Sequence, residues 1–382
     1  MQGYETMTRF PACRSFHSLT RAVVMFFALW VSLSSVVNAQ VANTRENRDY
    51  RYAAGLYAEG MYDMAVVELE RFLDTYPESE QQVNARFLIA GSYFYLTRFD
   101  RTIDMTSRIS REHPSAPIMD RVLFLEGRAR FQLGQYKDAI TVLEQMVSSF
   151  PQSEHVPEAH YNIGDAYYNL KDYPQAAEHY LVITSSHPES EVADWAWYSL
   201  GITYQNMGDY REAADSFGEV WSGFPESELR HICRFKTGES YFMLEDYENA
   251  VTMIDDVINA VDDRDMVIKG YYLMGEANFA LERYSQAREN YQIIFEQFPE
   301  ESIAPDALEA VGWTYYQEKN YPAAADAFQT VIDTFPKAEN LDSVSYRLAQ
   351  TRKLADDLTG AGDVFTRIAV QFPESPYADN AI

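Results

Sequence analysis

Residues 151–187 read PQSEHVPEAHYNIGDAYYNLKDYPQAAEHYLVITSSH and contain the clearest local pattern in the chain. Within this stretch, apolar and small residues recur every three or four positions over 158–169 and again over 173–186, which is typical of amphipathic helices. A short polar turn separates the two segments. A proline at the start ends the preceding helix, and the serine after it is expected to cap the next one. The stretch therefore predicts two helices joined by a tight turn.

The same pattern recurs with a period of 37 residues. The series prolines are Pro77, Pro114, Pro151, Pro188, Pro225, Pro299, Pro336 and Pro373, and Asp262 stands where one more would fall. One period back from the first proline, the series begins at residue 40. Nine predicted repeats follow: 40–76, 77–113, 114–150, 151–187, 188–224, 225–261, 262–298, 299–335 and 336–372. Residues 373–382 are predicted to begin a tenth repeat.

Within each repeat, positions are counted from zero at its first residue. Positions 13 and 25 are small in almost every repeat, position 22 is mostly tyrosine, and position 29 is mostly a large apolar residue. We expect the small residues to let the two helices of a repeat approach closely. We expect the aromatic residues at positions 22 and 29 to fill the space to the next repeat. A single repeat cannot bury its apolar face alone, so the pattern predicts one elongated stacked array.

The spacing resembles a known repeat family. Gly164, Tyr167, Ala176, Tyr180 and Pro188 show the order and spacing that are typical of the tetratricopeptide repeat. The resemblance implies an all-α fold, a right-handed α-α solenoid of helix-turn-helix repeats. The Phe-Pro-x-Ser junctions are similar to those of the exported bacterial branch, which includes periplasmic outer-membrane assembly and Tol-Pal-associated repeat proteins. The family shares a scaffold rather than a chemistry, so this resemblance says more about fold than about function.

The N-terminal segment predicts export. Residues 1–39 hold three arginines and one acid, and an apolar run over 22–37 ends in a small-x-small pattern that favours cleavage after Ala39. An uncleaved membrane anchor is the alternative, although the run is shorter than the ~20 residues that span a bilayer. Cleavage would remove Cys13 and leave Cys233 alone, so no internal disulfide is expected. We predict a periplasmic protein, soluble or peripherally associated with the envelope.

The net negative charge of the chain limits the kinds of partner that it is expected to bind. The 382 residues carry a formal net charge of -27, and loss of three bases and one acid with the signal peptide makes it -29. Clustered Lys and Arg, which phosphate binding needs, are scarce, so neither a nucleic acid nor an anionic lipid surface is an expected partner. A neutral or basic protein partner is favoured over an acidic one. The oligomeric state is left open.

Catalysis would need residues that break the repeat, and none forms a convincing site. His155 and His160 do not have the spacing of a helical zinc pair. Cys233 occupies a position that is small and apolar elsewhere, which favours packing over nucleophilic chemistry. The acidic run at 262–265 lacks the glycine and the later oxygen ligands of a calcium loop. The sequence therefore predicts a non-enzymatic protein with no catalytic residue, metal or cofactor.

Aromatic residues recur at positions 10 and 17 of the first helix of each repeat. These positions lie about two turns apart and share one face of the helix. The candidate partner-binding residues are Phe124, Phe131, Tyr161, Tyr168, Tyr198, Phe235, Phe242, Tyr272, Phe279 and Tyr316. Aromatic side chains are common anchors in interfaces.

In the family that the sequence resembles, first helices line the concave wall. The resemblance therefore implies an aromatic groove that binds a partner protein or an extended peptide, in a scaffold of the bacterial cell envelope. Family members that grip acidic peptide tails use Lys, Arg and Asn on this wall, whereas Phe and Tyr hold most of these positions here. Two alternatives stay open. Many of the rings could serve packing alone, and aromatic faces could also stack on the sugars of a cell-wall glycan.

Overall fold

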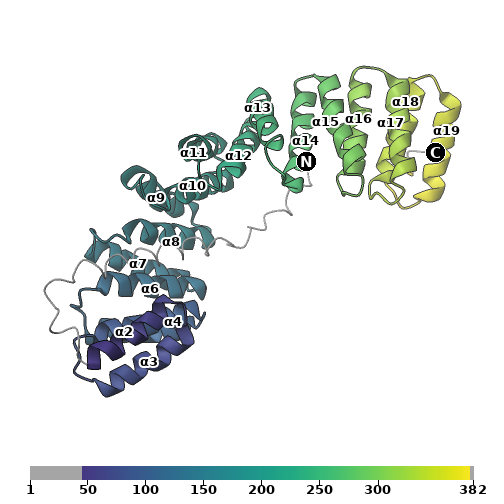
Figure 1. Cartoon of the computed structure of the whole chain (residues 1–382). Helices are drawn as coiled ribbons and strands as arrows, with labels where there is room; N and C mark the ends of the chain where they lie inside the picture. Colours follow the sequence, from purple (N-terminus) through teal and green to yellow (C-terminus); the bar gives the residue numbers. More distant parts are fainter. Residues whose placement is uncertain (1–44, 379–382) are drawn as a thin grey trace. The chain divides into compact units, whose positions relative to one another are not determined.

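The computed structural model describes residues 45–378 and contains eighteen helices and no strand within that range (Figure 1). This confirms the predicted all-α class. The predicted signal peptide and its cleavage site lie outside the described residues. The same is true of the last four residues of the predicted tenth repeat.

The helices follow one another at short intervals. Their bounds are α2 (Arg45–Ala58), α3 (Tyr62–Thr75), α4 (Gln82–Tyr95), α5 (Phe99–Glu112), α6 (Met119–Gln132), α7 (Tyr136–Ser149), α8 (Val156–Asn169), α9 (Tyr173–Ser186), α10 (Ala193–Met207), α11 (Tyr210–Gly223), α12 (Arg230–Met243), α13 (Tyr247–Ile258), α14 (Arg264–Ala280), α15 (Tyr284–Gln297), α16 (Ala304–Gln317), α17 (Tyr321–Thr334), α18 (Leu341–Leu354) and α19 (Leu358–Gln371). Even-numbered helices are the first helices of the predicted repeats and odd-numbered ones are the second.

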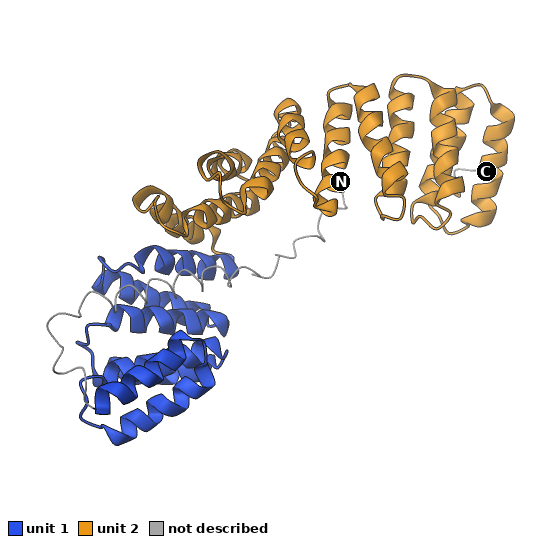
Figure 2. Ribbon diagram, viewed as in Figure 1, with its two compact units in different colours: residues 1–171 blue, residues 172–382 orange. Residues whose placement is uncertain are grey.

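The chain divides into two compact units, residues 1–171 and 172–382 (Figure 2). We call them unit 1 and unit 2. The division falls between α8 and α9, inside the predicted repeat 151–187, and no change in the sequence pattern marks it. Each unit is therefore described separately below, and the single elongated array stays a prediction.

Within each unit, every helix packs against the next one along the chain. First helices of successive repeats also touch each other, as α2, α4, α6 and α8 do in unit 1 and α12 and α14 do in unit 2. This order of packing confirms the predicted solenoid of helix-turn-helix repeats. The repeat boundaries themselves stay a prediction.

A glycine at position 13 leaves room for a large side chain from the second helix of the same repeat. A Cβ atom on Gly275 would lie 2.4 Å from the ring of Tyr291, and one on Gly201 would lie 2.6 Å from that of Phe217. Both rings are fully buried. The prediction that position-29 aromatics face the next repeat is thus incomplete, because they first fill the space left by their own repeat's glycine.

The turn between the two helices of a repeat has one constant backbone feature. Position 20 has a positive φ in every predicted repeat, at Gly60, Thr97, Gly134, Lys171, Gly208, Glu245, Glu282, Lys319 and Asp356. The chain then closes the helix end with paired hydrogen bonds, such as Lys319 N to Tyr316 O and Asn320 N to Tyr315 O, both 2.9 Å. This left-handed cap favours glycine, yet six repeats hold another residue.

Replacing Lys319 by glycine should therefore stabilise unit 2 by about 0.5–1 kcal/mol, since a left-handed conformation costs a side-chain-bearing residue more than it costs glycine. Equilibrium urea unfolding measures the change. Gly208→Ala, at the equivalent turn of the same unit, is the reverse control and should destabilise by about 1 kcal/mol. A loss of stability in Lys319→Gly would contradict this account of the turn.

Serines at the junctions link successive repeats. Ser153 donates to Asp120 Oδ2 at 2.7 Å, and Ser227 and Ser375 make the same bond to an aspartate 33 residues earlier, at 2.6 Å each. The serine also accepts a hydrogen bond from the backbone nitrogen two residues on, as Ser227 does from Leu229 at 3.1 Å. The expectation that these serines cap the following helix is wrong, because the backbone nitrogen that they bind lies just before the helix and their hydroxyls donate to the previous repeat.

The junction without proline differs from the others. Second helix α13 ends early, at Ile258, and α14 begins at Arg264. The side chain of Asp263 accepts a hydrogen bond from the backbone nitrogen of Met266 at 3.0 Å and caps α14. Part of the acidic run at 262–265 therefore has a structural role, as a helix cap in an exposed turn.

Candidate partner-binding surface

We call the side of the first helices that carries positions 7, 10, 14 and 17 the first-helix wall. Unit 1 contributes α2, α4, α6 and α8 to its wall, and unit 2 contributes α10, α12, α14, α16 and α18 to its own. Each wall holds part of the predicted aromatic set, and the two are considered one at a time.

Nine of the ten predicted aromatic residues are half-buried. They are Phe124, Phe131, Tyr161 and Tyr168 in unit 1 and Tyr198, Phe242, Tyr272, Phe279 and Tyr316 in unit 2. The tenth, Phe235, is only 4% exposed and belongs to the core around Ile254. Phe235 is therefore a packing residue, because burial leaves it too little surface to contact a partner.

The position-17 rings close the turn of their own repeat. Phe131 lies edge-on to Tyr136 at a centroid distance of 5.4 Å. The same contact joins Phe242 to Tyr247 at 5.4 Å, Phe279 to Tyr284 at 5.6 Å, and Tyr316 to Tyr321 at 5.5 Å. The partner in each of these pairs is the aromatic residue at position 22, which is Phe99 in the equivalent pair with Phe94. This row is thus accounted for by packing between the two helices of a repeat.

The position-10 rings combine a packed edge with some exposed surface. In unit 2, Tyr198 lies 5.9 Å from the ring of Phe217, and Tyr272 lies 5.9 Å from that of Tyr291. Both partners are the buried position-29 residues of the same repeat. A half-buried ring that is held from behind is the arrangement expected of an interface anchor.

Unit 1 carries arginines on its wall that the sequence analysis did not single out. The guanidinium of Arg121 lies 4.7 Å above the ring of Phe87. That of Arg128 lies 4.8 Å from the ring of Phe94 and 5.5 Å from that of Phe124. Both occupy wall positions, 7 and 14, so tabulating these positions for repeat 114–150 would have found them. The aromatic wall of unit 1 therefore carries two arginines, and the same two positions of the next repeat hold Glu158 and Asp165.

His155 stacks on Phe124 in the same wall. The rings are nearly parallel, at 6°, with centroids 4.9 Å apart. Burial lowers the pKa of His155, and the carboxylates of Glu154 and Asp120 oppose that shift. The histidine is thus explained by packing, and the part of the chain that the structure describes holds no group of three or more His, Cys, Asp or Glu suited to a metal ion.

A pH dependence follows from this histidine. A His pKa that is lower in the folded state favours the neutral ring, so its contribution to stability is present above the unfolded value of about 6.5 and is lost as pH falls through the folded value. The unfolding midpoint of unit 1 should thus fall as pH drops below 6.5. His155→Phe keeps the stack on Phe124 and should weaken this dependence, as measured by urea unfolding between pH 5 and 8. An unchanged pH profile would contradict it.

Unit 2 carries ion pairs on its wall. Glu239 binds Lys236 Nζ at 3.0 Å and also pairs with Lys269 from the next repeat. Burial alone would raise the pKa of Glu239, but the two lysines lower it below its ordinary value. This carboxylate is therefore charged and engaged within the protein.

Glu309 occupies position 10, where the neighbouring repeats place aromatic residues. Its Oε1 accepts from Arg347 at 2.8 Å and from Trp313 Nε1 at 3.2 Å, and its Oε2 accepts from Asn340 at 2.7 Å. The Arg347 guanidinium lies 4.7 Å above the Trp313 ring. Burial raises the pKa of Glu309, and Arg347 partly offsets the shift. These interactions join α16, which carries Glu309, to α18, which carries Arg347.

The remaining residue of interest from the sequence is Cys233. It is fully buried in α12, in the core that contains Phe217 and Leu229. Burial raises the pKa of its thiol, which keeps the thiol protonated. The prediction that Cys233 packs in the core is confirmed.

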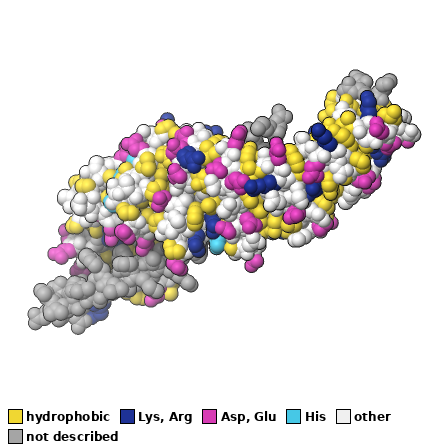
Figure 3. Space-filling view, turned by 90° about the horizontal axis from the view of Figure 1, so that it is seen from above, with side chains coloured by type: hydrophobic (Ala, Val, Ile, Leu, Met, Phe, Trp, Pro, Cys, Tyr) yellow, Lys and Arg dark blue, Asp and Glu magenta, His cyan; other side chains and the backbone are white. Residues whose placement is uncertain are grey.

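On the visible face of the molecule, Asp and Glu side chains are scattered among hydrophobic ones rather than gathered in one patch (Figure 3). Over residues 45–378, no helix combines the length and the apolar character that crossing a membrane requires.

Family models match three parts of the sequence. A model described as an outer membrane lipoprotein, YfiO, matches residues 118–208. Tetratricopeptide-repeat models match residues 49–79, 195–227 and 272–339. No protein of curated function matches the sequence.

Several solved structures are similar in fold. A tetratricopeptide repeat protein from Parabacteroides merdae ATCC 43184 is 15% identical, with 71% of this chain and 99% of that one covered and a TM-score of 0.44. MamA from Desulfovibrio magneticus RS-1 is 19% identical, covers 48% of this chain and 97% of its own, and has a TM-score of 0.40. A structure of Naa15/Naa10 bound to HypK-THB is 12% identical, with 88% of this chain and 53% of that one covered and a TM-score of 0.49.

The repeat-family matches fall in both units, on chain segments in which the structure contains paired helices, a small residue at position 13 and a left-handed turn at position 20. Residues 49–79, 195–227 and 272–339 therefore match tetratricopeptide repeats, and the helix pairs of the other predicted repeats follow the same spacing.

Proposed function

We propose that the protein is a non-enzymatic scaffold of the bacterial cell envelope that binds a partner protein or an extended peptide on the first-helix wall. The observation that carries this proposal is the partial burial of the position-10 rings and their contact with the core. Tyr198 and Tyr272 are half-buried, and each contacts a fully buried aromatic ring, tilted for Tyr198 and edge-on for Tyr272. A ring fixed in this way loses little conformational entropy when a partner covers it.

Placement in the envelope is supported by two independent features. Residues 118–208 resemble an outer membrane lipoprotein family. The N-terminal sequence predicts export with cleavage after Ala39. Tetratricopeptide repeats are protein-interaction modules, so a partner protein is the favoured kind of ligand.

The charge of the wall differs between the units, and so does the partner it suits. In unit 2, Glu276 accepts a hydrogen bond from the Tyr291 hydroxyl at 2.7 Å, and Glu239 and Glu309 lie on the same wall. Glu239 and Glu309 are already paired with basic side chains of the protein, so the preference for a neutral or basic segment rests on Glu276. In unit 1, Arg121 and Arg128 lie on the wall together with Glu158 and Asp165, so the charges there favour neither sign and the preference for a basic partner applies to unit 2.

A non-enzymatic role is favoured by what the buried charged groups do. Glu239 is paired with two lysines, and Glu309 is bound by Arg347, Trp313 and Asn340. Groups engaged in this way stabilise the stack of repeats.

The test is a crosslinking pull-down from native envelope with Tyr198→Leu/Tyr272→Leu. Leucine keeps apolar packing behind the wall and removes the flat face and the hydroxyl group, so we expect capture of the main crosslinked partner to fall at least tenfold while the helical circular dichroism is unchanged. The matched control is Tyr241→Leu, a half-buried tyrosine at position 16, on another face of α12.

Equal capture by the double variant and by wild type would rule the wall of unit 2 out as the binding surface. Sedimentation with purified peptidoglycan tests the glycan alternative. If wild type co-sediments with peptidoglycan, the double variant does not, and the pull-down yields no crosslinked protein, the ligand is a glycan rather than a protein.

A further inference from the structure

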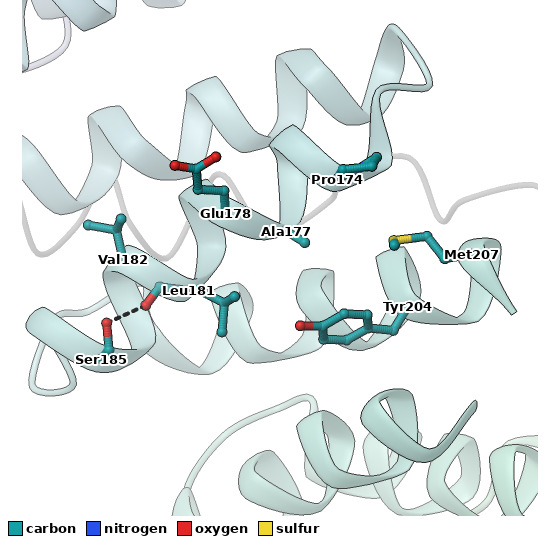
Figure 4. Close-up of a pocket in the computed structure, with 8 residues that line it drawn as sticks. All are labelled: Pro174, Ala177, Glu178, Leu181, Val182, Ser185, Tyr204 and Met207. Carbon is teal, nitrogen blue, oxygen red and sulfur yellow. Dashed lines mark hydrogen bonds between the residues drawn. The ribbon is translucent and has the colours of Figure 1, made fainter. Parts of the chain in front are cut away.

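A second surface on unit 2 breaks the repeat pattern on the side away from the first-helix wall. It is a groove of about 500 Å³ between α9 and α10, lined by Ala177 and Leu181 on one side and by Tyr204 and Met207 on the other (Figure 4). Met207 follows Tyr198 by nine residues, which is two and a half turns, so the two side chains lie roughly 180° apart around α10. The groove is therefore distinct from the surface proposed above.

The groove exposes apolar side chains, and two of its residues, Leu181 and Val182, are of a kind that most other repeats do not place there. Leu181 is 41% exposed and Met207 is 39% exposed. The position of Leu181 is polar or glycine in every other repeat, where it holds Glu70, Ser107, Glu144, Gly218, Asp255, Gln292, Gln329 and Thr366. Val182, next to Leu181 in the groove, also stands where most repeats have a charged or polar residue. Packing within the solenoid does not require these residues to be apolar.

The shape of the groove suits a helix. Ala177 and Leu181 lie one turn apart on α9, and Tyr204 and Met207 lie one turn apart on α10, so two apolar rows run side by side. An amphipathic helix presents apolar side chains at positions i, i+3 or i+4, and i+7, which match rows with this spacing. The volume is enough for several apolar side chains of such a segment.

The charges beside the groove are acidic. Glu178 lies on the groove itself and is exposed. Burial raises the pKa of Tyr204, and the carboxylates of Glu212 and Asp209 raise it further. The nearest arginine along α11, Arg211, lies over the ring of Tyr241 at 5.8 Å, towards the next repeat. A partner for this groove therefore needs basic side chains beside its apolar ones.

We propose that this groove binds an amphipathic helical segment of a partner protein, with leucine-like side chains inserted between Leu181 and Met207 and lysine or arginine placed against Glu178. The partner is identified by this chemistry, an apolar stripe bordered by bases. It binds independently of any ligand on the first-helix wall.

The test uses the full chain with 13C-labelled methionine methyl groups and a synthetic 15-residue helical peptide with leucines on one face and lysines on the other. We expect the peptide to shift the methyl resonance of Met207. Met243 on α12 is 52% exposed and serves as the internal control, whose resonance should stay in place. A peptide in which glutamate replaces every lysine should bind at least tenfold more weakly.

Two variants tie the shift to the groove. Leu181→Gln introduces the residue found in two other repeats and should weaken binding about tenfold, whereas Leu133→Gln, an exposed leucine in unit 1, should not. Glu178→Gln changes only an exposed side chain and should weaken binding of the lysine peptide about threefold at low salt, even if Leu181→Gln fails to fold.

Several outcomes would overturn the proposal. Equal shifts of Met207 and Met243 would mean that the peptide binds the acidic surface without selection. No shift of Met207, or binding that Leu181→Gln and Glu178→Gln both leave intact, would exclude the groove. If the Met207 resonance shifts when the protein concentration is raised without any peptide, the groove binds a second copy of this chain rather than a partner protein.

Discussion

Gly275→Ala should lower the stability of unit 2 by about 3 kcal/mol. The added methyl group would lie 2.4 Å from the Tyr291 ring, which is fully buried and whose hydroxyl donates to Glu276 at 2.7 Å. The ring cannot turn away without breaking that hydrogen bond, so the two helices of the repeat must separate. Overpacking of this kind typically costs about 1–3 kcal/mol, and an immobile ring places this site at the upper end.

Gly218→Ala is the matched control. Gly218 also lies inside a helix of unit 2, but a Cβ atom there meets nothing closer than Trp221 Nε1 at 3.9 Å. Alanine favours the helical state over glycine, so this variant should gain about 0.5–1 kcal/mol. Urea unfolding followed by circular dichroism measures both. Equal effects of the two substitutions would show that helix propensity, rather than the fit against Tyr291, governs position 13.

Removing the Arg347 side chain should destabilise unit 2 by about 2 kcal/mol at pH 7. Arg347→Ala leaves the buried carboxylate of Glu309 without its cation, and breaking one side of a buried ion pair is costly. The arginine side chain is 34% exposed, which reduces the cost below that of a fully buried pair. Lys353→Ala, an exposed change on the same helix, should stay within about 0.5 kcal/mol of wild type.

The destabilisation caused by Arg347→Ala should become smaller as the pH is lowered. Burial already raises the pKa of Glu309, and loss of Arg347 removes the main group that holds it down. A carboxyl group whose folded pKa exceeds its unfolded value adds stability below the unfolded value and loses it as pH rises through the folded one. Arg347→Ala should therefore be closer to wild type at pH 4.5 than at pH 7. The double variant Arg347→Ala/Glu309→Gln should recover part of the stability that Arg347→Ala loses at pH 7. If the stability difference between Arg347→Ala and wild type stays constant with pH, the buried charge of Glu309 is not its cause.

The aromatic rows show how far sequence could go towards the binding surface. The spacing of positions 10 and 17 correctly places both rows on the first helices. It could not separate their roles, because an aromatic residue suits both packing and binding. Only the contacts reveal that the position-17 rings, such as Phe242 against Tyr247, close the turn of their own repeat. The same contacts leave Tyr198 and Tyr272 as the better anchors and make Phe235 a core residue.

What the sequence determined by itself is the local structure and its repetition. A period of 37 residues, a glycine at position 13 and prolines at the junctions predict paired helices, since helix formation depends on neighbouring residues and each repeat contacts mainly the next. Burial, partners and charge environment depend on which side chains meet across helices. The tertiary structure alone therefore decided the division into two units, the stacking of Arg128 on Phe94 and Phe124, and the exposure of Leu181. These properties arise between residues that the chain brings together only on folding.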